Sequence, residues 1–249
     1  SDTCKGNGSM TQVAVVHALH RYPVKSMAGE TLNEIELGWH GFEGDRRFAF
    51  VRTNEMVGFP WLTASRVPEL LLYKPRYANG DITKGSVRVQ TPEGLDIELS
   101  DARLAERISH LYGSDVRPMR LDSGIFDQTS LSLISKETIA ALSDETNLNL
   151  EVARFRPNIV VELLDGRPFA EDSWVGRRLK FGTSLDAPAL RVTERDIRCV
   201  MVNFDPTTLA KDERILKTIA QRHETCIGIY GSTERKGRVQ VGDIISLED

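Results

Sequence analysis

The chain has 249 residues, of which 40% are hydrophobic and 27% are charged, values that are ordinary for a globular protein with a substantial core. Its formal net charge of -4 gives no overall basic field, so a nucleic acid polymer or a membrane surface is not an expected partner. Any bound anion must therefore be held by a local cluster of cations. The sequence contains no run of about 18 apolar residues, so no segment is expected to span a bilayer.

The chain opens with a polar segment, residues 1–9, that lacks the apolar stretch of a signal peptide. We expect this segment to be a remnant of expression or a disordered leader before Met10, so Cys4 takes no part in the chemistry. Two cysteines remain, Cys199 and Cys226, which are too few for a disulfide framework. The expected location is therefore the reducing cytoplasm.

Short β-rich runs separated by turn residues fill the first half of the chain. They span residues 12–19, 31–37, 47–51, 70–77, 86–90 and 95–99. Because no helices separate them, they favour a barrel or a sandwich-like sheet over βαβ units. A helix is predicted over residues 101–111, after the capping pair Ser100-Asp101, and a domain boundary is expected near residue 121.

The second half mixes strands with two further helices. Strands are predicted over 130–134, 158–161, 177–181, 184–192, 226–230 and 238–247. Helices are predicted over 136–142 and 211–222, the second with one apolar face. The expected fold class is therefore mainly β with a few helices.

An early segment could present donors to an anion. A strand ends at Pro23, and Lys25 and Ser26 follow it directly. One interpretation is a backbone bend that offers the ammonium and the hydroxyl to a bound anion. The alternative is a surface turn with a solvated lysine.

Paired arginines follow a glycine turn at the start of the next strand. Because side chains alternate along a strand, Arg46 and Arg47 cannot both face the same ligand. Either arginine could instead form an ordinary surface ion pair with Asp45 or Glu43.

A third basic segment spans residues 154–161. At a period of two, Arg154, Arg156 and Asn158 share one face of a strand, and apolar residues occupy the other face. Arginine suits bidentate binding of a phosphate, so this face could be a recognition surface or simply an exposed polar face. Pro157 would confine the strand to a sheet edge or to its first residue.

Cys199 lies close to two arginines, Arg195 and Arg198. Nearby cations favour the thiolate, which is the form that binds soft or intermediate metals. The alternative is a buried cysteine that packs as a small hydrophobic residue. Cys226 lies in an apolar strand and is expected to be core packing. Two cysteines cannot build a four-thiolate zinc or iron–sulfur site, and no nucleotide-binding or serine-hydrolase motif is present.

Taken together and in order, these segments resemble MOSC proteins. Residues 22–26 and 44–46 resemble the N-terminal MOSC β-barrel domain, and residues 154–161, 169–174, 198–199, 205–206 and 237–243 resemble the β-barrel fold of the MOSC domain itself. The likeness extends to the bacterial hydroxylaminopurine-resistance proteins and the mitochondrial amidoxime-reducing component. It divides the chain into the leader 1–9, an N-terminal MOSC β-barrel domain over 10–121 and a MOSC domain over 122–249.

The resemblance implies the molybdenum–molybdopterin cofactor (Moco), in which a pterin dithiolene and one protein cysteine hold the metal. That cysteine corresponds here to Cys199, which would be both the metal ligand and the catalytic residue. The cofactor contacts of the family fall on Lys25, Ser26, Arg46, Arg156 and Asn158, with Arg198 beside the ligand. In two respects the chain departs from some relatives: Met27 stands where they carry cysteine, and no ferredoxin-type cysteine motif is present.

The resemblance also implies an oxidoreductase that reduces N-hydroxylated compounds, such as hydroxylamines, amidoximes and N-hydroxylated bases. Electrons would come from a separate electron-transfer protein, either a flavoprotein reductase or a ferredoxin-type protein. Asp196 and Asp205 are candidates to handle protons. Two alternatives remain: a sulfur carrier with a persulfide on Cys199, and a non-catalytic carrier of Moco.

Overall fold

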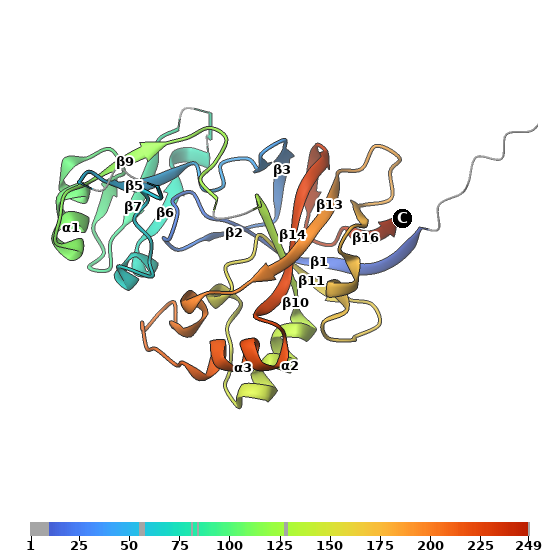
Figure 1. The fold of residues 1–249 in the computed structure, drawn as a ribbon. Coiled ribbons are helices and arrows are strands. Elements are labelled where there is room, and N and C mark those ends of the chain that lie inside the picture. Colours follow the sequence, from blue (N-terminus) through green and yellow to red (C-terminus); the bar gives the residue numbers. More distant parts are fainter. Residues whose placement is uncertain (1–9, 55–57, 81, 84, 127–128, 249) are drawn as a thin grey trace, which may run out of the picture.

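The computed structural model describes residues 10–54, 58–80, 82–83, 85–126 and 129–248. The expected leader, residues 1–9, lies outside the described residues. Within the described part the chain forms sixteen β-strands and three α-helices (Figure 1). The predicted fold class, mainly β with a few helices, is confirmed.

Seven strands form a closed barrel. They are β1 (Thr11–Arg21), β10 (Leu131–Ser135), β11 (Ile159–Leu163), β12 (Arg178–Phe181), β13 (Ala189–Ile197), β14 (Cys226–Arg235) and β16 (Ile244–Glu248). Their order is β11-β10-β14-β13-β12-β16-β1, and β1 pairs again with β11, which closes the ring. All neighbours are antiparallel except β10 and β11, which run parallel. The short strand β2 (Glu30–Leu32) extends the sheet beyond β1.

Apolar side chains from these strands fill the barrel. Along β1 the buried positions include Ala14, Val16 and Leu19. The spacing between them changes from two residues to three after Val16, where the pairing with β11 shifts register between Val16 and Ala18. Such a bulge inserts one residue and turns the following side chains back toward the interior. The first strand of the chain is therefore part of the same core as the last one.

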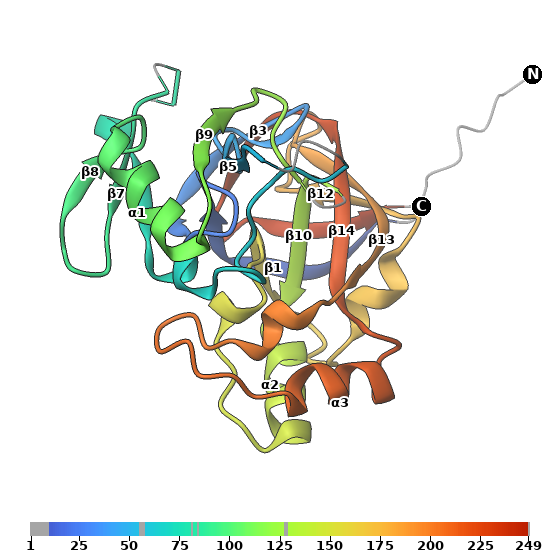
Figure 2. The ribbon, with the colours of Figure 1, turned by 60° about the vertical axis from the view of Figure 1, so that its left-hand side comes forward.

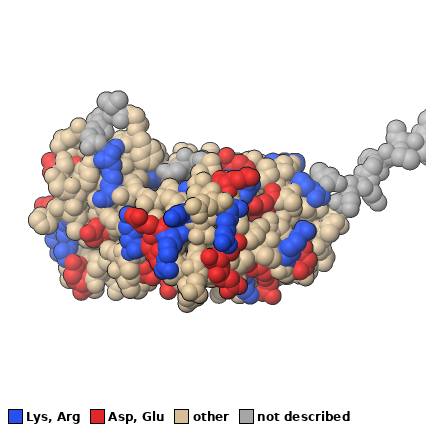
Figure 3. Space-filling model, turned by 60° about the horizontal axis from the view of Figure 1, so that its bottom comes forward, with Lys and Arg blue, Asp and Glu red and all other residues tan. Residues whose placement is uncertain are grey.

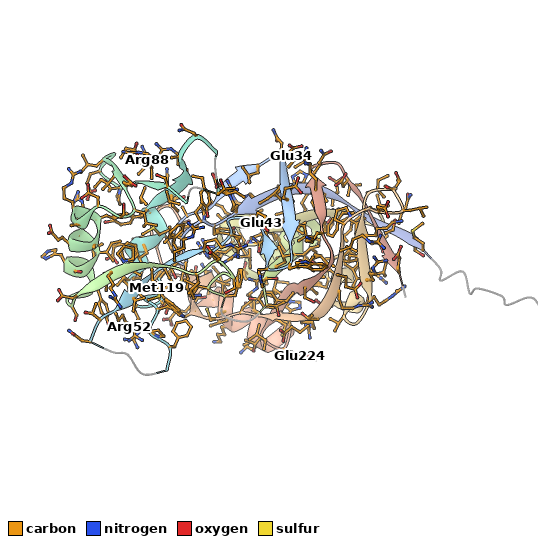
Figure 4. All side chains as sticks on the ribbon, turned by 90° about the horizontal axis from the view of Figure 1, so that it is seen from above. Glu34, Glu43, Arg52, Arg88, Met119 and Glu224 are labelled. Atoms are coloured by element: carbon orange, nitrogen blue, oxygen red, sulfur yellow. The ribbon has the colours of Figure 1, made fainter. Side chains whose placement is uncertain are left out.

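The intervening part of the first half forms a lobe beside the barrel (Figure 1). Its strands are β5 (Phe48–Arg52), β6 (Lys74–Tyr77), β7 (Val87–Gln90), β8 (Asp96–Glu98) and β9 (Val116–Arg120), with β5 paired to β9 and β6-β7-β8 in a second sheet. Arg52 and Met119, labelled in Figure 4, belong to the β5–β9 pair. Helix α1 (Ala102–Tyr112) begins after Asp101, whose carboxylate accepts a hydrogen bond from the Arg103 N–H at 2.9 Å. The lobe has its own hydrophobic core.

A small three-stranded sheet joins distant parts of the chain. It has the order β15-β3-β4, from β15 (Gly237–Gln240), β3 (Glu34–Gly38) and β4 (Gly41–Phe42). Helices α2 (Lys136–Thr146) and α3 (Arg214–Arg222) lie together at one end of the barrel (Figure 2) and share a third core with β10 and β14. Five short 3-10 helices connect the described elements: η1 (Pro68–Leu72), η2 (Ala78–Gly80), η3 (Val152–Arg154), η4 (Ala170–Trp174) and η5 (Val200–Asn203).

Several predicted boundaries are wrong for identifiable reasons. The run 70–77 is a strand only from Lys74, because Pro68 starts a 3-10 helix before it. The run 238–247 is two strands, since Gly242 adopts a left-handed φ of 93° in a turn. The helix predicted from residue 211 starts at Arg214, because Lys211 forms a β-bridge with Phe204 instead.

Charges of both signs are interspersed on the face shown in Figure 3, in keeping with the net charge of -4. No α-helix in the described part of the chain combines the length and the apolar character that crossing a membrane requires.

Candidate functional site

One cavity collects the residues that the sequence predicts to bind the cofactor or its metal. It has a volume of about 590 Å³. Its lining includes Lys25, Ser26, Arg46, Arg156, Asn158, Arg198 and Cys199. These residues come from the segment after β1, from the approach to β5, from the approach to β11 and from the end of β13. The folded chain thus brings together side chains that lie more than a hundred positions apart in the sequence.

Strand alternation at the end of β13 places the thiol at the cavity mouth. Ile197 and Cys199 are exposed, whereas Asp196 and Arg198 are buried, at 1% and 8% exposure. Cys199 keeps an extended backbone, with φ -116° and ψ -177°, so the alternation continues past the last strand residue. The alternative in which Cys199 is a buried packing residue is therefore wrong.

Arg198 points into the protein, away from solvent. Its Nε donates to the Ile227 carbonyl and its Nη1 to the Phe155 carbonyl, both at 2.8 Å, and its Nη2 lies 2.9 Å from Asp196 Oδ2. The guanidinium thus ties β14 and the segment before β11 to the end of β13. Sequence proximity to Cys199 suggested a charge beside the thiol, but the structure commits this charge to Asp196.

Arg195 is also committed elsewhere. It forms ion pairs with Glu224 at 2.7 Å and with Asp172 at 3.1 Å, and it donates to the His223 carbonyl. Glu224, labelled in Figure 4, precedes β14. Arg195 is absent from the cavity lining, so the expectation that it helps to hold a thiolate at Cys199 has no support here.

The two proton-handling candidates differ sharply. Asp196 lines the cavity, and burial raises the pKa of its carboxyl although the Arg198 guanidinium works against that rise. The Ser132 hydroxyl donates to Asp196 at 2.8 Å, and Tyr230 is a further hydrogen-bond partner. Asp196 is thus a buried carboxyl, linked to cavity-lining hydroxyls, that can hold a proton.

Asp205 has a structural role instead. Its carboxylate accepts hydrogen bonds from the backbone N–H groups of Thr207 and Thr208 at 2.9 and 2.8 Å. Those hydrogen bonds, with that of Thr208 the strongest influence, hold the pKa of Asp205 below its ordinary value. The residue is not among the described residues that line the cavity, so it is a poor proton donor for that site.

The bend predicted after Pro23 is a tight turn. Lys25 donates its backbone N–H to the Phe48 carbonyl at 2.8 Å, and Ser26 adopts a left-handed φ of 67°. The side chain of Lys25 is buried, with 5% exposure, and its ammonium lies 5.6 Å from the centre of the Phe59 ring. The alternative of a solvated surface lysine is therefore wrong. Met27, next in the chain, is fully buried in the core of the lobe.

Two guanidinium groups lie against one tyrosine ring. Arg46 and Arg156 lie 4.6 and 4.5 Å from the centre of the Tyr22 ring. The ring is anchored, because its hydroxyl donates to the Pro157 carbonyl at 3.0 Å. Burial raises the pKa of Tyr22 to about 12, although both arginines work against the rise. Tyr22 therefore stays neutral, and its ring forms cation–π contacts with both guanidinium groups.

Arg46 and Arg47 form the ion pairs that the alternative interpretation anticipated, but only Glu43 of the four partners lies at the surface. Arg46 contacts the fully buried Asp45 at 2.6 Å, and Arg47 lies 3.7 Å from Glu43. Arg46 precedes β5 and has a left-handed φ of 47°, so it is not a strand residue. This turn conformation, and not strand alternation, sends Arg46 into the cavity.

The strand predicted through residues 154–158 is wrong, although its arginines do converge. Arg154 ends the 3-10 helix η3, and Arg156 has a left-handed φ of 52° just before Pro157. The strand begins only at Ile159. Both arginines still line the cavity, because the turn gathers side chains that a strand face was expected to gather.

Asn158 is engaged by the protein itself. Its Oδ1 accepts from the Ser132 backbone N–H at 3.2 Å and from Arg46 at 3.3 Å, and its Nδ2 donates to the His20 carbonyl at 3.2 Å. The amide therefore braces β1 against β10 while it lines the cavity. A cofactor contact by Asn158 would be shared with this bracing role.

Cys226 differs from its predicted core role. Its side chain is half-buried, lies outside the hydrophobic clusters and donates weakly to the Glu224 carbonyl at 3.5 Å. Burial raises the pKa of its thiol. Cys226 is not among the cavity-lining residues, so of the two cysteines that the structure describes, Cys199 is the one that faces the cavity.

No sequence motif selects several further residues of the lining: Phe59, Phe126, Ser132, Met201 and Tyr230. They lie on elements far apart in the chain, and none belongs to a charged motif. Ile197 also lines the cavity, and its position two residues before Cys199 indicates a shared face only once the segment is known to be extended.

The charged groups of the cavity are almost all cations. The described lining contains Lys25, Arg46, Arg66, Arg154, Arg156 and Arg198 and a single carboxylate, Asp196, which pairs with Arg198. In addition, Arg154 is buried, and its Nε has no hydrogen-bond partner in the described part of the chain. An anionic ligand would supply the missing acceptor.

Two family models match consecutive parts of the chain. The MOSC domain model matches residues 115–246, which is more than half of the chain, and the model of the MOSC N-terminal beta barrel domain matches residues 13–122. This chain is a MOSC-domain protein. The MOSC protein is 27% identical to mitochondrial amidoxime-reducing component 1 of Homo sapiens, over 96% of the chain and 84% of that relative.

Other relatives have a different name and length. The MOSC protein is 24% identical to the molybdenum cofactor sulfurase of Drosophila mojavensis over 90% of the chain, and it spans 34% of that longer protein. Among solved structures, the YUAD protein from Bacillus subtilis aligns with a TM-score of 0.53 at 14% identity, covering 97% of this chain and 98% of its own. That last likeness shows a shared fold.

Proposed function

We propose that this MOSC protein binds Moco through Cys199 and reduces N-hydroxylated compounds such as hydroxylamines, amidoximes and N-hydroxylated bases. One observation carries the proposal: an exposed cysteine opens onto a cavity lined by cations, in a protein whose net charge is -4. The likeness to an amidoxime-reducing component supports the class of reaction. We place the protein in the cytoplasm, a reducing compartment that suits the free thiols of Cys199 and Cys226.

The donor set fits a phosphate-bearing cofactor. Arginine forks and a lysine ammonium are the usual ligands of phosphate, and Arg154 has an unused buried Nε. No group of three His, Cys, Asp or Glu side chains within the described ranges could hold a metal ion. A metal bound by Cys199 would therefore take its other ligands from a cofactor, as a pterin dithiolene provides.

The residues of the chain would divide the work. Lys25, Arg46 and Arg156 would hold the phosphate and the pterin, and Cys199 would fix the metal at the cavity mouth. When bound, Moco would supply the two-electron change that converts R–NH–OH and two protons into R–NH2 and water. Asp196 would hold one of those protons, since its carboxyl is buried and linked to Ser132. Electrons would come from a separate flavoprotein reductase or ferredoxin-type protein.

The test measures molybdenum per chain in protein purified from a Moco-producing host. Wild type should carry about one molybdenum, Cys199→Ser should carry almost none, and the control Cys226→Ser should match wild type. An equal metal content in wild type and Cys199→Ser would overturn the proposal. Reduction of hydroxylamine with a supplied electron-transfer chain then tests the activity.

A sulfur carrier is the second candidate. Its support is that an exposed thiol can bear a persulfide without any metal, together with the likeness to molybdenum cofactor sulfurases. Cyanide-releasable sulfur on Cys199 in protein that never binds molybdenum would favour it. Bound molybdenum without any reductase activity would instead indicate a carrier of Moco.

A further inference from the structure

The cavity lining contains apolar side chains as well as cations. Among them are Phe59, Phe126, Ile197 and Met201. Phe59 and Ile197 are 45% and 54% exposed, although both are large apolar residues. Single exposed apolar residues are common on protein surfaces, so exposure alone carries no argument. What matters is that these two line the same cavity as the exposed thiol.

The backbone fixes Ile197 beside Cys199. Ile197 is the last residue of β13 and lies opposite Cys226 of β14 in the antiparallel register. The next backbone N–H, that of Arg198, donates to the Thr225 carbonyl at 2.8 Å, so the pairing continues toward the thiol. Because the chain stays extended through Cys199, the side chains of Ile197 and Cys199 project on one side.

Phe59 is held from the lobe. Its backbone carbonyl accepts a hydrogen bond from the Arg52 guanidinium, and the Lys25 ammonium lies 5.6 Å from the centre of its ring. The ammonium and the ring thus lie close together in the cavity lining. Phe59 and Ile197 thus belong to different parts of the fold, the lobe and the barrel, and both border the cavity that Cys199 enters.

We propose that Phe59 and Ile197 form an apolar lip that binds the aromatic group of the substrate, so the protein selects aryl N-hydroxylated compounds over hydroxylamine itself. The inference rests on the proposed function. An aryl ring would be removed from water against the lip while the polar N–OH group points to Cys199. In the reaction the N–O bond breaks, one N–H bond forms, and oxygen leaves as water. The two electrons come from a flavin or iron–sulfur protein, and two protons complete the balance.

The experiment uses full-length, Moco-loaded protein with a supplied electron-transfer chain. The variants are Phe59→Ala and Ile197→Ser, and the control is Leu185→Ala, which removes an exposed apolar side chain that does not line the cavity. The first readout is the kcat/KM for phenylhydroxylamine divided by the kcat/KM for hydroxylamine. We expect each lip variant to lower this ratio about three- to tenfold, and the control to leave it at the wild-type value.

A second readout does not depend on turnover. Saturation-transfer NMR compares binding of benzamide and acetamide, which share an amide and differ by the ring. Wild type should bind benzamide more tightly, and both lip variants should lose that preference. If wild type shows the benzamide preference but reduces neither hydroxylamine, the reductase proposal fails and the lip stands. If both hydroxylamines are reduced and the ratio is unchanged in both variants, the lip is wrong and the reductase stands.

Discussion

Removing the guanidinium of Arg198 should destabilise the protein whether or not a cofactor is bound. In Arg198→Ala the carbonyls of Ile227 and Phe155 lose their donors, and the buried carboxylate of Asp196 loses its ion pair. Removing one partner of a buried ion pair costs about 3–5 kcal/mol. For a protein of this size that corresponds to a fall in Tm of about 6–20 °C.

The assay is thermal unfolding of cofactor-free protein, made in a host that cannot synthesise Moco. The control is Arg191→Ala, which removes an arginine of similar size from a 2.7 Å ion pair with Glu234. That arginine is 37% exposed, so its loss should cost no more than about 1 kcal/mol. The double variant Arg198→Ala/Asp196→Ala should recover part of the stability, because the unpaired carboxylate is then gone as well.

A Tm for Arg198→Ala within about 2 °C of the Arg191→Ala control would refute this reasoning. The inward hydrogen bonds would then contribute little to stability. The sequence motif Arg198-Cys199 would have to be explained by contact with the ligand alone, as the resemblance to MOSC proteins first suggested.

Three further outcomes follow from other contacts. Burial raises the pKa of the Glu171 carboxyl, so the folded state binds its proton more tightly than the unfolded state does, and stability should fall as the pH rises above about 4.5. Glu171→Gln should reduce this fall in Tm between pH 4 and 7. An unchanged dependence of Tm on pH would contradict the assignment. A Cβ at Gly29 would lie 2.5 Å from the Tyr22 ring. Gly29→Ala should therefore lower the free energy of unfolding in urea by about 1–3 kcal/mol and reduce the amount of cofactor retained. Wild-type values for both quantities would exclude the clash. Arg156→Ala should lower the molybdenum content per chain after gel filtration while the Tm stays near that of wild type. The control Arg167→Ala, which removes an exposed arginine, should retain the metal. Full retention of the metal by both variants would exclude Arg156 from the cofactor site.

The fold class could be predicted because its signals are local. Alternating apolar runs and turn residues indicate strands, and the capping residue Asp101 marks a helix start that the structure confirms. The closed barrel could not be derived in the same way. Its closure depends on β1 pairing with both β11 and β16, and pairing over such separations leaves no trace in any short window of sequence.

The residues of the site could be predicted from the sequence, but their arrangement could not. Charge and residue type selected Arg154 and Arg156, and both line the cavity. Their route into it is a left-handed turn before Pro157, which a periodicity of two cannot anticipate. For Arg198, adjacency in sequence suggested proximity to the Cys199 thiol. Alternation along an extended segment sends neighbouring side chains to opposite faces, and burial of one face then decides which of them meets solvent.

The position of β1 in the barrel has a consequence for how the chain reaches its native state. Residues 11–15 pair with residues 244–247, so the ring closes only when β16 has left the ribosome. Until then β1 lacks one of its partners. In the sequence, the whole lobe separates β1 from both strands that it must pair with, β11 and β16. Contacts of such high sequence separation fold slowly, and unpaired edges recruit other chains. A fragment that begins at residue 115 would lack this strand, and it should aggregate unless residues 11–21 are supplied in trans.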